Sequence, residues 1–175
     1  GARVRSVADN RQRTQYDSNE QFTAESGQTA LRFYLHTESD IVDAPSIGPR
    51  TAERLRAIGI HTVADLLGAD PEEVADQLNH RRFGADRIRA WQQQSILMCR
   101  IPELRGHDAQ LLVAAGMLEA ERLSECSPEW LLTQIDPVAE SSEGKRILRG
   151  SSRPDLEEVT QWIRYAGQSR ALAVA

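Results

Sequence analysis

Residues 44–60 read APSIGPRTAERLRAIGI and carry the strongest structural signal in the chain. Gly48-Pro49 interrupts the sequence just before an Ala/Arg/Leu run, and a second glycine, Gly59, follows that run. Proline suits the first position of a helix, and glycine suits the tight turns at either end of one. The stretch therefore predicts a tight turn leading into a short helix. Such a turn either presents its amides to an anion or simply joins two packed helices.

The same pattern recurs further along the chain. Residues 45–78 align without gaps on residues 102–135, with nine identities in 34 positions. The identities fall largely on glycine, proline and apolar positions, which fix turns and cores. Each copy is followed by a segment that carries a tryptophan, and in the second copy a longer spacer containing EGKRILRGSSRP comes first. The sequence predicts two tandem units of about five short helices each, packed together because neither buries enough apolar surface alone.

The starts of several helices are well marked. Asp70-Pro71-Glu72 and Ser127-Pro128-Glu129 each combine an N-cap residue with proline at the first helical position. Thr62 with Asp65 is typical of a capping box, and Asp155 opens a final helix. Aromatic residues are scarce and β-branched alternation is rare, so we expect an all-α fold. Three tryptophans are expected to anchor the core: Trp91, Trp130 and Trp162.

The chain divides by composition into five expected parts. The first part is polar and has almost nothing to bury, which is typical of a loosely attached arm. The second part places Leu31, Tyr34 and Leu35 at helical spacing, so a short helix is expected over residues 25–37. The parts are an arm (1–24), an N-terminal helix and linker (25–40), a first unit (41–100), a second, degenerate unit (101–170) and a C-terminal tail (171–175).

Charge argues against avid binding to nucleic acid. The chain has 21 basic and 26 acidic side chains, and residues 101–175 alone account for −4 of the net charge of −5. A protein that binds nucleic acid strongly usually carries a basic surplus, and no long segment here has one. No apolar run reaches the roughly 20 residues of a membrane span, so we expect a cytoplasmic protein without a membrane partner. Because the chain begins with Gly1 rather than Met, we expect it to be trimmed or tagged, or to be cut from a longer protein.

The sequence offers no catalytic apparatus. Cys99 and Cys126 are 27 residues apart without a CxxC pattern, so buried free thiols are expected rather than a disulfide or a zinc site. The histidines are scattered, and no paired-carboxylate, nucleophile-elbow or phosphate-loop pattern occurs. We therefore expect a protein that is not an enzyme.

Residues 44–52 resemble the helix-hairpin-helix motif, in which an apolar-x-Gly-apolar-Gly turn is followed by three residues and alanine. Ser46 stands where that family has its first glycine. Residues 59–67 resemble the usual continuation into a second such hairpin. Two units that end in the 154–163 pattern Pro-Asp-Leu-x-x-Val-Thr-x-Trp-Ile also resemble an uncharacterised bacterial domain-of-unknown-function family with tandem helix-hairpin-helix units. The resemblance covers about residues 41–170 and implies a helix-hairpin-helix (SAM-like) architecture, but it transfers no activity.

The resemblance implies candidate ligands for one nucleic-acid phosphate. These are the backbone amides of Ser46, Gly48, Arg50 and Thr51. It also implies a monovalent cation at the backbone carbonyls of Val42, Ala44 and Ile47, and no other cofactor. Five arginines form either the positive edge of a nucleic-acid surface or a solvated face paired with Asp76 and Asp86; they are Arg54, Arg81, Arg82, Arg87 and Arg89.

The second copy is a weaker candidate. It lacks glycine at both hairpin positions, and Glu103 and Asp108 add negative charge beside its expected anion site. Arg105, Gly106 and His107 are its remaining candidate ligands, with His107 favoured as a structural residue at the start of a helix.

Two hypotheses follow for the function. In the first, the chain is a binding module that contacts the backbone of DNA or RNA without sequence preference. In the second, it is a protein-interaction or architectural domain whose partner is another protein or another domain of the same chain.

Overall fold

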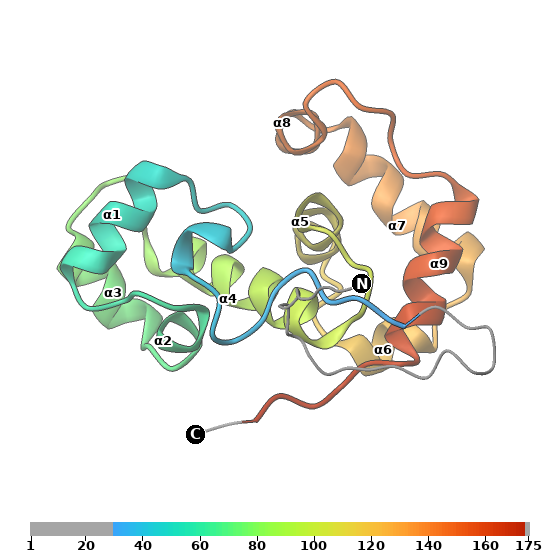
Figure 1. The fold of residues 1–175 in the computed structure, drawn as a ribbon. Helices are drawn as coiled ribbons and strands as arrows, with labels where there is room; N and C mark the ends of the chain where they lie inside the picture. The colour runs from blue at the N-terminus through green and yellow to red at the C-terminus, as the bar shows by residue number, and fades with distance from the viewer. Residues whose placement is uncertain (1–29, 174–175) are drawn as a thin grey trace, which may run out of the picture. The chain divides into compact units, whose positions relative to one another are not determined.

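The computed structural model describes residues 30–173 of the chain and contains, in that range, nine α-helices, one short 3-10 helix and no β-strand (Figure 1). The expected all-α fold is confirmed. Residues from Phe33 onward form one compact unit. The expected arm over residues 1–24 lies outside the described residues. Within residues 30–173, no helix combines the length and the apolar character needed to cross a membrane.

Five helical elements occupy the first half of the described chain. The 3-10 helix η2 comes first, and α4 is the longest. α4 packs against α2 and α3 and also against α5, so it joins the two halves. The elements are η2 (Ile41–Asp43), α1 (Pro49–Ala57), α2 (Val63–Leu67), α3 (Pro71–Leu78) and α4 (Ala85–Arg100).

Five further helices follow. α9 packs against α6 and α7, while α5 packs against α7 and α8. α1 and α5 have the same length and begin 57 residues apart, and the same holds for α2 and α6. The helices are α5 (Gly106–Ala114), α6 (Ala120–Ser124), α7 (Pro128–Glu140), α8 (Ser142–Leu148) and α9 (Leu156–Ala166).

Backbone conformation follows the same 57-residue spacing. We call residues 44–48 the first turn and residues 101–105 the second turn. Ser46 in the first turn and Glu103 in the second both have positive φ, 71° and 64°. Gly59 and Gly116, which follow α1 and α5, have φ of 95° and 85°. Positive φ costs an L-residue conformational free energy. Its occurrence at two corresponding non-glycine residues therefore indicates that the packing around each turn dictates the shape of the turn.

The predicted helix starts are confirmed. The side chain of Asp70 accepts from the Glu72 amide at 3.0 Å, and Ser127 caps α7 in the same way through the Trp130 amide. Thr62 and Asp65 form a reciprocal capping box at α2. These side chains satisfy amides that the first turn of a helix leaves without partners.

The core is continuous through the described unit. Ala52 and Leu55 of α1, like Ala109 and Leu112 of α5, are fully buried. Two of the three predicted tryptophan anchors are confirmed, since Trp91 and Trp162 are buried. The expectation for Trp130 was wrong. Its side chain is 42% exposed, because it lies near the start of α7 and outside the face that buries Leu131, Ile135 and Ala139.

The expected helix over residues 25–37 was also wrong in its described part, since residues 30–37 contain no helix. This segment uses its backbone to cap α2 instead. The carbonyls of Thr37 and Ser39 accept from the amides of Ala64 and Val63, at 2.8 and 3.0 Å. A helix over these residues would withdraw those carbonyls into its own ladder.

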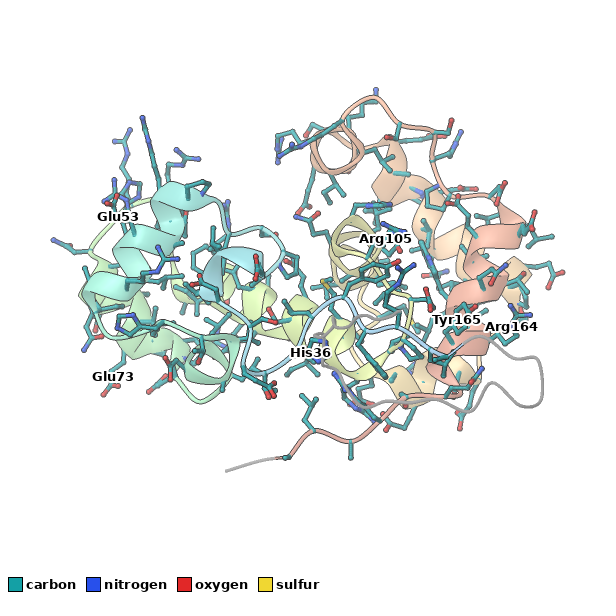
Figure 2. The ribbon with its side chains drawn as sticks, in the orientation of Figure 1. His36, Glu53, Glu73, Arg105, Arg164 and Tyr165 are labelled. Atoms are coloured by element: carbon teal, nitrogen blue, oxygen red, sulfur yellow. The ribbon has the colours of Figure 1, made fainter. Side chains whose placement is uncertain are left out.

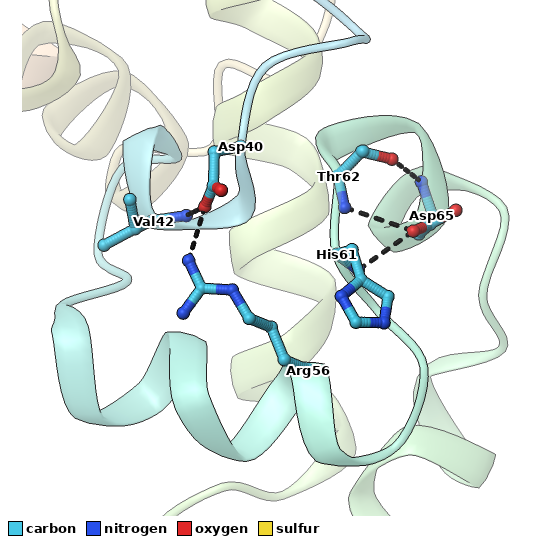
Figure 3. Close-up of polar contacts among 6 residues, drawn as sticks. All are labelled: Asp40, Val42, Arg56, His61, Thr62 and Asp65. Atoms are coloured by element: carbon cyan, nitrogen blue, oxygen red, sulfur yellow. Dashed lines mark hydrogen bonds and ion pairs between the residues drawn. The ribbon is translucent and has the colours of Figure 1, made fainter.

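Two carboxylates fix the surroundings of η2 and α2 (Figure 3). Asp40 accepts from the Val42 amide at 2.9 Å and from the Arg56 guanidinium at 2.6 Å, and these contacts lower its pKa. Asp65 accepts from the amides of His61 and Thr62, which lower the pKa of Asp65. Each carboxylate is thus held ionised by donors that belong to the local fold.

Arg170 ties the end of the described chain to its beginning. Its Nε donates to the Cys99 carbonyl at 2.7 Å, and its guanidinium lies 3.6 Å from the centre of the Phe33 ring. It also contacts Nδ1 of His36, which is labelled in Figure 2. The backbone amide of Arg170 donates to the Arg100 carbonyl at 2.9 Å. This residue therefore fastens residues 33–36 against the end of α4.

Candidate nucleic-acid interface

The first turn and the start of α1 together present three backbone amides that have no partner among residues 30–173. Gly48 is the N-cap of α1 with extended backbone, φ −87°, and no side chain caps this helix. Within residues 30–173, the amides of Gly48, Arg50 and Thr51 donate no hydrogen bond to the protein. Proline at position 49 has no amide to offer. Free amides at the positive end of a helix attract anions.

Ser46 contributes a side chain as well as an amide. Its hydroxyl donates to Oε1 of Gln94 and accepts from Nε2 of Gln110, both at 2.7 Å. The first turn is thereby fastened to α4 and α5. Our sequence reasoning missed both glutamines. The signal for Gln94 was a polar residue three positions after Trp91 on the buried face of α4.

The Ser46 contacts predict that two substitutions lower the stability, and that Ser46→Ala lowers it more than Ser46→Gly. Ser46→Ala removes the hydroxyl, leaves Gln94 without its donor and keeps a Cβ at positive φ, so we expect the free energy of unfolding to fall by about 2 kcal/mol. Ser46→Gly loses the same hydrogen bonds but adopts positive φ freely, so its loss is expected to be smaller by up to about 1 kcal/mol. Urea unfolding measures both. A Ser46→Ala protein as stable as the parent would contradict this account of the turn.

The second turn holds its own anion. The amide of Arg105, which corresponds to that of Gly48, donates to Oδ2 of Asp108 at 3.0 Å. Oδ1 of the same carboxylate lies 3.2 Å from Nε2 of His107. Asp108 is only 7% exposed. Burial raises the pKa of Asp108, while the Arg105 amide and His107 oppose that rise.

The three candidate ligands of the second turn all contact other parts of the protein, and His107 lies beside Asp108 at the start of α5, in agreement with the structural alternative. The guanidinium of Arg105, a residue labelled in Figure 2, donates to the Tyr34 hydroxyl at 2.9 Å and lies over the Tyr34 ring. Gly106 packs on the first turn, since a Cβ at this position would lie 3.7 Å from Cβ of Pro45. These residues serve contacts inside the protein.

The candidate basic surface is only partly paired. Arg89 forms ion pairs with Asp86 at 3.0 Å and with Glu72 at 2.9 Å. The expected pairing with Asp86 is thus found for this arginine, and Glu72 takes the part predicted for Asp76. Four arginines are exposed and form no ion pair with residues 30–173: Arg54, Arg81, Arg82 and Arg87.

The carbonyls suggested for a monovalent cation come from a single short stretch. Val42 belongs to η2, while Ala44 and Ile47 lie in the first turn. The Ala44 carbonyl accepts from the Ile47 amide at 3.3 Å, which leaves one of its lone pairs for another partner.

A groove opens beside the first turn. Its volume is about 500 Å³. One wall comes from the first turn, with His107 and Gln110 of α5 beside it, and the other from the end of α8 and the loop that follows. The residues that line it are Ser46, Ile47, Gly48, His107, Gln110, Ile147, Leu148, Arg149 and Ser151.

Among residues 30–173, the cysteines and the possible metal ligands do not form an alternative centre. Cys99 and Cys126 are free thiols, and burial raises the pKa of Cys99 to about 12, so that thiol stays protonated at neutral pH. Cys126 is only partly buried, unlike the prediction. The described part of the chain contains no group of three or more His, Cys, Asp or Glu residues that could hold a metal ion.

Comparison with known proteins places the chain among uncharacterised domains. A family model described as a domain of unknown function, DUF4332, matches residues 45–169, which include every helix from α1 to α9. No curated protein and no solved structure gives a match. The predicted resemblance to a family without assigned activity is confirmed, and the chain belongs to the DUF4332 family.

Proposed function

We propose that this chain is a non-catalytic module of two tandem helix-hairpin-helix units, and that its first turn binds the backbone of DNA or RNA without sequence preference. The tandem arrangement is supported by α1 and α5, which are equally long and begin 57 residues apart. It is supported further by positive φ at Ser46 and Glu103, at corresponding places before those helices.

One observation carries the proposal. The Asp108 carboxylate binds the Arg105 amide in the second turn, so a turn of this backbone shape accommodates an anion at that amide. At the position that corresponds to Asp108, the first half of the chain has Thr51, which is neutral. The amides of the first turn are thus open to an anion from outside. A phosphate oxygen is the anion that nucleic acid supplies.

The surroundings support weak binding without base specificity. Amides of the backbone and the exposed Arg50 and Arg54 of α1 recognise phosphate and carry no information about sequence. A cation at the carbonyls of Val42, Ala44 and Ile47 would add positive charge next to the same turn. Because the chain as a whole carries a net charge of −5, long-range attraction to nucleic acid is small.

Fluorescence anisotropy tests the proposal directly. The whole chain is titrated into labelled oligonucleotides of about 20 nucleotides, and each phosphate contact adds about −0.7 to −0.9 to the slope of log K against log salt. We expect a slope between about −1 and −3, with equal affinity for two unrelated sequences. Absence of binding at ~50 mM salt, where such contacts are strongest, would refute the proposal.

Docking of another protein is the second candidate. The exposed Trp130 favours it, because tryptophan is enriched among residues that dominate the energy of protein interfaces. The acidic second half of the chain would complement a basic partner. A partner whose capture survives nuclease treatment and is lost on Trp130→Ala would support this function over nucleic-acid binding.

A further inference from the structure

The second half of the chain contains a helix that the first half lacks. Only residues 79–84 separate α3 from α4, whereas α8 (Ser142–Leu148) and a loop lie between α7 and α9. Gly144 seats α8 tightly, because a Cβ on this residue would lie 1.9 Å from the Val138 carbonyl oxygen of α7. The added segment therefore has a fixed position against the preceding helix.

Charge sets this segment apart from its surroundings. Residues 142–153 carry four basic side chains and one acidic side chain. The remainder of residues 101–175 carries four basic and eleven acidic side chains. The one basic stretch of an acidic half thus forms the second wall of the groove beside the first turn.

Arg149 supplies that wall with a positive charge that is unpaired among the described residues. α8 ends at the groove, and the carbonyls at the end of a helix carry partial negative charge. Two of these carbonyls are capped, since the amides of Arg149 and Ser151 donate to Lys145 and Leu148 at 3.0 and 2.9 Å. The guanidinium of Arg149 is exposed and forms no ion pair within residues 30–173. Arg153, by contrast, pairs with Asp136 and Glu140.

We propose that the groove between the first turn and α8 holds one strand of nucleic acid, with one phosphate at the first turn and another at Arg149. The inference rests on the proposed function and deepens it by adding a second contact and a substrate class. His107 and Gln110 also line the groove. Gln110 donates to Ser46 and His107 lies beside Asp108, so these two side chains fix the lining of the groove.

The size of the groove favours a single strand over a duplex. Its volume of about 500 Å³ is that of a pocket for a small ligand, so it admits one sugar-phosphate chain between its walls. A duplex would have to lie across the groove and would lose one of the two contacts. Arginine suits the second contact because its planar guanidinium binds two phosphate oxygens at once.

Arg149→Ala in the whole chain tests the inference. We expect the affinity for a single-stranded oligonucleotide at ~50 mM salt to fall about three- to tenfold, and the salt slope to become shallower by about 0.7, the value of one phosphate contact on a single strand. Arg122→Ala is the matched control. It removes the same charge from an exposed arginine of α6 that does not line the groove, so its affinity and slope should equal those of the parent.

The outcomes separate this inference from the proposed function. If the parent binds but Arg149→Ala and Arg122→Ala behave alike, the groove wall makes no contact and the inference fails, while binding at the first turn stands. The inference also fails if the parent binds a duplex as tightly as a single strand of equal length. If the parent binds neither, the proposed function fails with it. Thermal unfolding of both variants checks that the fold is unchanged.

Discussion

Gly48→Asp is expected to weaken binding to nucleic acid strongly while making the protein slightly more stable. Gly48 is the N-cap of α1 with extended backbone, and a Cβ there meets no atom within 4 Å. A carboxylate at this position would accept from the amides of Arg50 and Thr51, a gain of about 0.5 kcal/mol over glycine. The same carboxylate would occupy the anion site and repel phosphate, so affinity at ~50 mM salt should fall at least about tenfold.

Gly48→Ala provides the control for this change. Alanine adopts the same backbone conformation and fits the same space, but it has no oxygen to cap the helix. Its affinity for nucleic acid should stay within about twofold of the parent, because the amides remain open. Fluorescence anisotropy measures the change in affinity of each variant, and thermal unfolding measures the change in its stability. If both variants bind like the parent, the amides of the first turn are not the phosphate site.

Gly144→Ala is expected to produce the largest loss of stability. The added Cβ would lie 1.9 Å from the Val138 oxygen and 2.7 Å from the Ala139 Cα, and backbone atoms cannot move aside as a flexible side chain would. α8 must therefore shift away from α7, at an expected cost of about 3 kcal/mol or more, equivalent to roughly 10 °C in Tm.

Gly84→Ala is the matched change for this prediction. Gly84 is the N-cap of α4, whereas Gly144 lies inside α8, and a Cβ on Gly84 meets nothing within 4 Å. Its Tm should stay within a few degrees of the parent, since its backbone needs no special conformation. Equal melting of the two variants would mean that α7 and α8 are not packed as the structure describes.

Local signals in the sequence predicted much of the fold. The starts of α3, α7 and α9 could be predicted because each N-cap side chain lies within three residues of the amide that it caps. The extended conformation of the segment before η2 could not be predicted, because its carbonyls cap α2, which lies more than 20 residues away in the sequence. Periodicity in residues 31–35 described burial of Leu35 correctly but could not tell an extended chain from a helix.

In the candidate site too, local features could be predicted from the sequence and long-range contacts could not. Gly48-Pro49 predicted the turn before α1, and Glu103 and Asp108 made the second turn the weaker candidate for phosphate. The contacts of Ser46 with Gln94 and Gln110 join residues 48 and 64 positions apart, and no spacing rule connects them. The spacer that contains α8 was recognised as an insertion, but its place beside the first turn depends on tertiary packing.

Asp108 gives the second turn a tethered ligand. The Asp108 carboxylate accepts a hydrogen bond from an amide only three residues away. Its effective concentration at that amide is therefore high, roughly millimolar or more, and exceeds that of free phosphate in solution. An external anion must therefore displace a group that never diffuses away, and this competition weakens binding of nucleic acid at the second turn. Saturation experiments on the parent chain should accordingly yield one class of site, and a second class should emerge only when that tether is cut by Asp108→Ala.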